Sequence, residues 1–219
     1  MMDLSIYLIN DVKPQNLNQS ISELQKMLSH LTYSHVPISD DAGFKGVMAE
    51  NDIYCFDSEK TVSDYQYAIE HFFVTPQTNW LDVLEAFAKN SSNIMPVIDE
   101  KGGYLGYYEL NDIISLFSEM PFFIEDGAVL VVEKGIKDYS FSEISQIVES
   151  NNAKLYGIFL SNVENDLAQI TLKLGTDGII NIMQTFRRYG YNILSSHQGD
   201  AYLENLQERS EYLKKYLNI

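Results

Sequence analysis

Two aspartates, Asp52 and Asp112, have the side chains best suited to binding a ligand. They stand at equivalent positions of a repeated pattern, where each follows an apolar run and opens a predicted helix. An ionised carboxylate acts only as a hydrogen-bond acceptor, so it suits the donor groups of a ligand. It can also satisfy free backbone N–H groups at a helix N-terminus and favour the helix dipole. Both roles are open to one side chain.

The sequence carries no recognisable catalytic motif. It lacks the Gly-x-Ser-x-Gly, Walker, His-Glu-x-x-His and Gly-x-Gly-x-x-Gly patterns. Among the four histidines only His30 and His35 are close in sequence, and no third metal ligand stands near them. The pairs Asp40-Asp41 and Glu125-Asp126 are typical of solvated turns. We therefore predict no catalytic residue, no metal site and no obligatory cofactor, so that the protein is not an enzyme.

Charge and cysteine content limit the partners and the compartment. Among 219 residues, 31 acidic and 15 basic side chains give a net charge of −16, which repels nucleic acid and anionic membrane surfaces. The only cysteine, Cys55, cannot form an intramolecular disulfide, which favours a cytoplasmic location.

The apolar stretch in Met1–Asn10 is too short to span a bilayer. We interpret it as an element packed on the core, with a signal peptide as the alternative.

An internal repeat organises the first half of the chain. The run from residue 35 to residue 53 recurs from 94 to 113, and the matches pair Pro37 with Pro96, Gly46 with Gly106, and Asp52 with Asp112. Each copy predicts a strand, a turn, a second strand and a helix. A further helix precedes each copy, with Ser20 and Asn79 as predicted N-caps. Upstream of these helices, Val12-Lys13-Pro14 resembles Val74-Thr75-Pro76.

This repeat resembles a tandem pair of cystathionine-β-synthase-type (CBS) domains. The family motif is an apolar residue, Pro, Val, a variable residue and Asp, followed by a turn with glycine. A glycine, two apolar residues, Ser or Thr, two variable residues and an aspartate then follow. The resemblance implies an α+β fold in which residues 1–122 form a CBS pair, with repeats at about 11–58 and 72–120. In the family, the clefts between repeats often bind adenosine-containing ligands. A small ligand of this class is the expected partner.

The resemblance also implies where such a ligand would bind. In nucleotide-binding members the motif aspartate accepts hydrogen bonds from the ribose hydroxyls, and the segments leading into each repeat help to form the cleft. The candidate ligand-binding residues are Asp52, Asp112, Lys13, Thr75, His35, Pro37, Pro96, Tyr107 and Glu109. The hydroxyl residue that the family carries three positions before the aspartate is replaced by Ala49 and Glu109. A carboxylate at Glu109 is expected to weaken binding of AMP or ATP, unless it turns outward to solvent.

The second half follows a βαββαβ order. A predicted strand at 128–132 precedes a helix capped by Ser140. Two strands follow at 154–161 and 168–174, joined by a loop at 162–166. A second helix, capped by Asp177, precedes a last strand at 191–195. This order resembles a ferredoxin-like ACT domain, placed at 126–198. The combination of a CBS pair and an ACT-like domain resembles the bacterial acetoin-utilisation accessory family.

Amino-acid-binding ACT domains carry Asp-x-Pro-Gly after the first strand, but Asp138-Tyr139-Ser140-Phe141 lacks the glycine. Amino-acid binding is therefore not expected.

Two features suggest association with other chains. Residues 199–219 predict an amphipathic helix, which either docks on its own domain or contacts a second chain. The run of Ile113, Ile114, Leu116 and Phe117 is too apolar for a solvated helix face, which predicts a homodimer. The expected function is that of a regulatory protein that senses a ligand and acts on an unknown protein partner. The alternative is a dimerising scaffold with degenerate ligand pockets.

Overall fold

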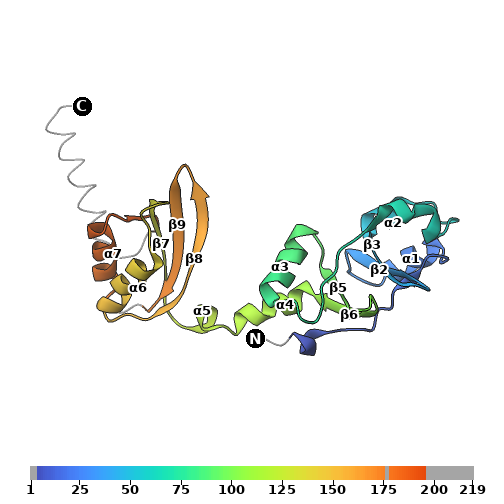
Figure 1. Ribbon diagram of the computed structural model, residues 1–219, viewed down its shortest axis with the longest axis horizontal. Coiled ribbons are helices and arrows are strands. Elements are labelled where there is room, and N and C mark those ends of the chain that lie inside the picture. The colour runs from blue at the N-terminus through green and yellow to red at the C-terminus, as the bar shows by residue number, and fades with distance from the viewer. Residues whose placement is uncertain (1–3, 176–177, 196–219) are drawn as a thin grey trace. The chain divides into compact units, whose positions relative to one another are not determined.

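The computed structural model describes residues 4–175 and 178–195, in a mixed α+β fold with two compact units, Met1–Glu119 and Met120–Ile219 (Figure 1). The predicted helix at 199–219, the predicted cap Asp177 and His197 lie outside the described residues. No helix in the described ranges is both long enough and apolar enough to cross a membrane.

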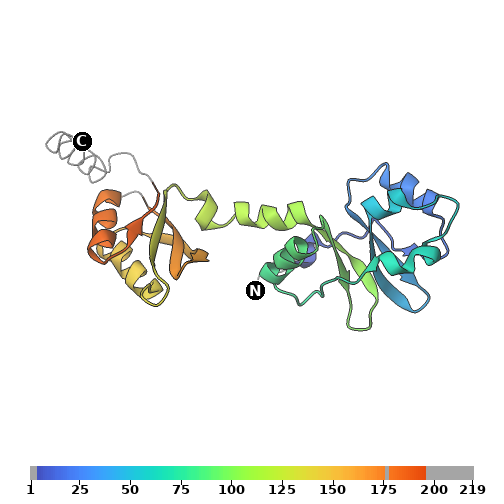
Figure 2. The same ribbon diagram turned by 90° about the horizontal axis from the view of Figure 1, so that it is seen from above.

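The first unit contains the two predicted repeats. The elements of repeat 1 are α1 (Ile21–Leu28), β2 (His35–Asp40), β3 (Gly43–Ala49) and α2 (Glu50–Cys55). Those of repeat 2 are α3 (Trp80–Lys89), β5 (Ile94–Ile98), β6 (Tyr104–Glu109) and α4 (Leu110–Ser118). Figure 2 shows the hairpins β2–β3 and β5–β6 within this unit. Strand, turn, strand and helix follow one another in both copies, as predicted.

The predicted helix caps hold in both repeats. The Ser20 hydroxyl accepts the backbone N–H of Glu23, and the Asn79 side chain accepts those of Leu81 and Asp82. Each cap satisfies N–H groups that have no partner within the helix. Two 3-10 helices, Ser5–Tyr7 and Val62–Ala68, complete the helical elements described in this unit.

Short flanking segments extend both sheets in the same way. In repeat 1, β1 (Gln15–Asn16) runs parallel to β2, and β4 (Ile69–Glu70) runs antiparallel to β3. In repeat 2, Val74 makes a parallel bridge to Val97, and Ile9 makes an antiparallel bridge to Tyr107. Before repeat 1, the chain therefore passes from the edge of the repeat 2 sheet to the edge of the repeat 1 sheet. Before repeat 2, it passes in the opposite direction.

Each repeat has its own hydrophobic core. Ile21, Leu24, Ile38 and Met48 lie in the core of repeat 1. The core of repeat 2 includes Leu4, so the N-terminal segment packs on it as expected. The apolar residues of α4 were expected to form a dimer face, but Ile113 and Leu116 belong to this core, and Phe117 packs edge-on against Trp80. Only Ile114 is exposed, so this reason for a homodimer was wrong.

The second unit has the predicted βαββαβ order. A short helix, α5 (Pro121–Ile124), precedes these elements, which are β7 (Ala128–Gly135), α6 (Phe141–Ser150), β8 (Leu155–Glu164), β9 (Leu167–Leu174), α7 (Ile179–Arg188) and β10 (Asn192–Ile193). The strands form one sheet in the order β10-β7-β9-β8, with every neighbouring pair antiparallel.

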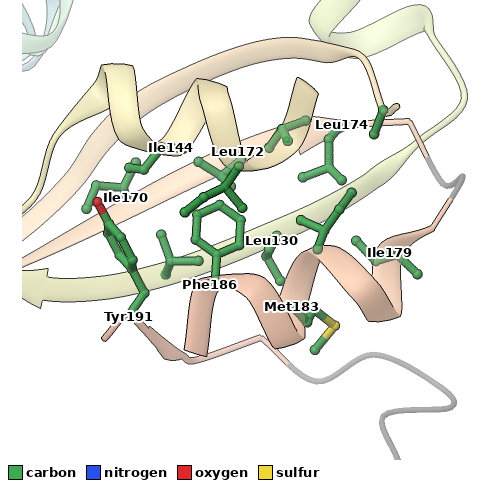
Figure 3. Close-up of a cluster of buried hydrophobic side chains, with 14 of the residues drawn as sticks. Leu130, Ile144, Ile170, Leu172, Leu174, Ile179, Met183, Phe186 and Tyr191 are labelled. Atoms are coloured by element: carbon green, nitrogen blue, oxygen red, sulfur yellow. The ribbon is translucent and has the colours of Figure 1, made fainter. Parts of the chain in front are cut away.

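Both longer helices of this unit cover the same face of the sheet. Between them and the strands lies a core that contains Leu130, Ile170, Leu172 and Phe186 (Figure 3). The alternation predicted for β9 is confirmed, because Ala168, Ile170, Leu172 and Leu174 are all buried.

Three local predictions for this unit were wrong. Strand β8 continues to Glu164, so the predicted loop at 162–166 shrinks to a tight turn at Asn165 and Asp166, whose φ angles are 51° and 59°. Such left-handed pairs match the twist of a hairpin. The apolar spacing in the sequence of α6 predicts that Phe141 belongs to the apolar stripe of this helix, but Phe141 is exposed. The N-cap residue of α7 is Gly178, whereas the sequence predicted Asp177.

Candidate functional site

The two repeats meet through equivalent residues. Ser34 and Asn93 each stand three positions before the matched prolines, and they bond to one another: the Ser34 N–H donates to Asn93 Oδ1 at 2.8 Å, and the Asn93 N–H donates to Ser34 Oγ at 2.9 Å. At the hairpin turns, the Phe44 N–H donates to the Gly102 carbonyl at 3.3 Å. The repeats thus meet both at the residues before β2 and β5 and at their hairpin turns.

Two tyrosines and two carboxylates form a chain of close polar contacts across this interface. Tyr107 Oη donates to Asp11 Oδ1 at 2.7 Å, Tyr33 Oη donates to Glu109 Oε1 at 2.8 Å, and the two hydroxyl oxygens lie 2.7 Å apart. We call this the tyrosine–carboxylate chain. Burial is the main reason why the pKa of Tyr107 and of Tyr33 lies above the usual value of 10.0. The hydroxyls therefore stay protonated and act as donors to the carboxylates.

A groove of about 490 Å³ adjoins this chain. Its lining residues are Asp11, Val12, Lys13, Gln15, Met27, His30 and Leu31. Asp11 belongs to both the groove and the chain, and Tyr104 Oη donates to the Val12 carbonyl at 3.2 Å. The groove therefore offers apolar surface from Met27 and Leu31 beside a carboxylate, an ammonium group and an imidazole. Such a mixture suits a small ligand with one apolar ring and several polar groups.

The sheet register corrects the predicted equivalence of Lys13 and Thr75. Gln15 pairs with Ile38 and Val74 with Val97, so Val74 corresponds to Gln15 and Thr75 to Asn16. The following turns agree: the Asn16 N–H donates to the Gln19 side chain at 2.7 Å, and the Thr75 N–H donates to Thr78 Oγ1 at 3.0 Å. The similarity of the two Val-x-Pro triplets misled the alignment, because strand pairing and helix caps fix the register.

His35 lies in a second cluster of polar groups. Its ring is buried, and its Nδ1 is 2.8 Å from Ser34 Oγ while its Nε2 is 3.6 Å from Glu70 Oε1. The ring also packs edge-on against Phe72. Burial lowers the pKa of His35 below the usual 6.5, and the nearby charges of Glu70 and Asp52 partly oppose this shift.

This shift predicts a pH-dependent stability. Because the folded-state pKa of His35 is depressed, its contribution is complete above about 6.5 and is lost as the pH falls below that value. The free energy of unfolding should therefore fall by up to about 1.4 kcal/mol per pH unit below 6.5, until the folded-state pKa is reached. Urea unfolding of the parent and of His35→Gln at pH 7.5 and 5.5 checks this. A pH dependence identical in both proteins contradicts it.

The remaining predicted site residues have different surroundings. Pro37 and Pro96 are buried within β2 and β5, where their partners are Val47 and Tyr107. Asp52 is exposed and Asp112 half-buried, each in the first turn of its helix. The structure thus brings Tyr107 and Glu109 together and joins them through Asp11 to the groove with Lys13, whereas His35 lies near Asp52.

Sequence reasoning missed Asp11, Tyr33 and His30. Tyr33 corresponds to Ser92 in the other repeat, so the repeat alignment gave no signal that it was special. Asp11 was missed because its partner Tyr107 is distant in sequence.

In the ranges that the structure describes, no three His, Cys, Asp or Glu residues are grouped to hold a metal ion.

Comparison with known proteins identifies part of the first unit. Residues 62–119, which include α3 to α4, match the model of the CBS domain family. No curated protein matches the chain.

Several solved structures are similar to the chain. A CBS domain pair/ACT domain protein from Thermotoga maritima is 22% identical, with 54% of this chain and 98% of that chain covered and a TM-score of 0.47. The CBS domains of a transcriptional regulator from Streptococcus pneumoniae are 14% identical, with 52% and 98% covered and a TM-score of 0.48. CBSX2 in complex with AMP is 17% identical, with 52% and 95% covered and a TM-score of 0.46.

Proposed function

We propose that this chain is a non-catalytic, cytoplasmic regulatory protein whose two CBS repeats bind a small adenosine-containing ligand in the groove beside Lys13. The observation that carries the proposal is the groove of about 490 Å³ that adjoins the tyrosine–carboxylate chain at the meeting of the repeats. The CBS domain at 62–119 supports a regulatory role, because domains of this family commonly act as ligand sensors.

The charges near the groove select among adenosine compounds. Asp11 lines the groove, and Glu109 lies at the other end of the tyrosine–carboxylate chain. Two carboxylates against the one ammonium group of Lys13 leave a net negative charge at this place, which repels phosphate groups and attracts cations. We therefore expect adenosine itself, or an adenosine derivative with a positive charge such as S-adenosylmethionine, to bind more tightly than AMP or ATP.

A thermal-shift screen with adenosine, S-adenosylmethionine, AMP and ATP tests this function. A ligand at a hundred times its dissociation constant adds about 2.7 kcal/mol to the stability of the folded protein. Met27→Trp, which fills the groove, should abolish the shift, while Lys26→Trp at the neighbouring exposed position should leave it unchanged. Absence of a shift with every adenosine compound contradicts ligand sensing, and an unchanged shift in Met27→Trp places the ligand elsewhere.

For the second unit we propose an ACT-like role without amino-acid binding at the first loop. The βαββαβ order and the sheet order β10-β7-β9-β8 support this proposal. The loop after β7 folds on itself: the Asp138 N–H donates to the Gly135 carbonyl at 2.8 Å, and a Cβ atom at Gly135 would lie 2.6 Å from the Asp138 carboxylate. Free amino acids should therefore give no saturable heat in calorimetry.

One observation favours the alternative of a dimerising scaffold. The polar groups of the tyrosine–carboxylate chain satisfy one another without a ligand. A cleft whose polar groups are already paired gains less from binding a ligand. The thermal-shift screen separates the two functions, because a scaffold gives no shift with any ligand.

A further inference from the structure

A cavity of about 510 Å³ lies beside α7 in the second unit. Its described lining residues are Asn151, Asn181, Gln184, Arg187 and Arg188. Asn151 directly follows α6, and the other four belong to α7. Because residues three or four positions apart are neighbours on the surface of a helix, Asn181, Gln184 and Arg188 lie along the same side of α7. We call this cavity the arginine pocket.

The arginine pocket lies on the side of α7 that does not pack against the sheet. Figure 3 shows Met183 and Phe186 pointing from this helix into the core. Asn181, Gln184 and Arg188 are exposed instead. These side chains therefore do not fill the core, and they can contact a ligand that arrives from solvent.

The charge of the arginine pocket is opposite to that of the chain. The sequence has 31 acidic residues and only three arginines. Two of these arginines, Arg187 and Arg188, line the pocket, and none of its described lining residues is acidic. The amide groups of Asn181 and Gln184 add further N–H donors. The pocket therefore offers two positive charges and several donors, which favours an anionic ligand.

Two hydrogen bonds along α7 orient Arg188. Its Nη2 donates to Thr185 Oγ1 at 2.8 Å, and Thr185 Oγ1 donates to the Asn181 carbonyl at 2.8 Å. Thr185 is buried, so this support is shielded from water. A guanidinium group has five N–H donors in a rigid fork, so a bond to Thr185 leaves the group able to bind an oxyanion. Because the side chain is already oriented, binding costs less conformational entropy.

Basic residues at the end of a helix also have a role without a ligand. They interact favourably with the helix dipole, and Lys26 and Lys89 occupy the last turns of α1 and α3. The dipole accounts for a positive charge at the end of α7, but it requires neither two adjacent arginines nor the amides of Asn181 and Gln184. A variant at Lys89 therefore separates the two roles.

We propose that the arginine pocket binds the phosphate group of a small molecule. Two guanidinium groups balance the charge of a phosphate group, which is close to −2 at neutral pH, better than that of a single carboxylate. The fork of Arg188 matches two phosphate oxygens, and Asn181 and Gln184 can donate to the others. A volume of about 510 Å³ is within the usual range for small-molecule sites. This site belongs to the second unit and is separate from the groove beside Lys13.

Calorimetry on the full chain with inorganic phosphate, at pH 7.5 in a phosphate-free buffer, tests the pocket. Phosphate should give saturable heat, and acetate at the same ionic strength should bind at least about tenfold more weakly. Arg188→Gln should weaken phosphate binding at least about tenfold, because it removes charge-assisted hydrogen bonds. Arg188→Lys should still weaken it about threefold, because an ammonium group keeps the charge but lacks the planar fork.

Lys89→Gln is the matched control, because it removes an exposed cation from the last turn of α3. It should leave the phosphate affinity unchanged, as should Met27→Trp, which fills the groove of the first unit. Circular dichroism should show that every variant is folded. A parent without saturable phosphate heat overturns the proposal. So does a phosphate affinity that is equal in the parent and Arg188→Gln, or that Lys89→Gln lowers as much as Arg188→Gln does.

Discussion

Replacing either Gly46 or Gly106 with alanine is expected to lower the free energy of unfolding by about 3–5 kcal/mol. Both glycines have positive φ angles, 141° and 155°, that side chains rarely adopt. A Cβ atom at Gly46 would collide with the carbonyl oxygen of Glu70, and one at Gly106 with that of Ile9. Backbone oxygens cannot move aside as a flexible side chain can. Urea unfolding followed by circular dichroism measures the loss.

Gly102→Ala distinguishes the free-energy cost of a Cβ collision from the cost of backbone strain. Gly102 also has a positive φ, 83°, but no atom lies within 4 Å of the position of its Cβ. Its substitution should therefore cost only about 1–2 kcal/mol, the penalty for the left-handed conformation. If all three variants lose the same free energy, close packing against Ile9 and Glu70 is not the reason for these glycines.

These two glycines show how much of the first unit could be predicted from its sequence. The matching of Gly46 with Gly106, together with the paired prolines and aspartates, was enough to predict two copies of one fold. The reason for the glycines was not visible, because Ile9 and Glu70 reach them from segments that only the completed sheets bring near. Periodicity reports which side of a strand is buried, but it does not report which segment covers the edge of that strand.

The candidate site was harder to predict than the fold. Tyr107 and Glu109 belong to a recognisable repeat, but Asp11 and Tyr33 do not, and the structure joins all four. Lys13 lines the groove, but the alignment that proposed it as a ligand-binding residue is contradicted by the sheet register. Pairing across the interface between repeats depends on side chains distant in sequence, and a single sequence carries little signal for such contacts.

The affinity for AMP is expected to rise about twofold to threefold in Glu109→Gln, while that for adenosine stays unchanged. Glu109 neither turns away to solvent nor stands alone, since Tyr33 donates to it at 2.8 Å. Two tyrosine hydroxyls separate Glu109 from Asp11, which lines the groove. A like charge about 8 Å from a phosphate costs about 2 kcal/mol at an effective dielectric constant near 20. Because Glu109 is half-buried, solvent and salt screen much of this repulsion, leaving about 0.4–0.7 kcal/mol. Glutamine keeps the acceptor for Tyr33 and removes the charge.

Asp11→Asn and Glu100→Gln complete the comparison by calorimetry with AMP and adenosine. Asp11→Asn also removes a charge from the tyrosine–carboxylate chain, and because Asp11 lines the groove its effect on AMP should be at least as large. Glu100 is an exposed carboxylate in the turn between β5 and β6, so its substitution should change neither affinity. Raising the salt concentration should reduce the difference between the parent and Glu109→Gln, because it screens the repulsion. Equal AMP affinities in the parent, Glu109→Gln and Asp11→Asn rule out the electrostatic selection of ligands, even if adenosine binds.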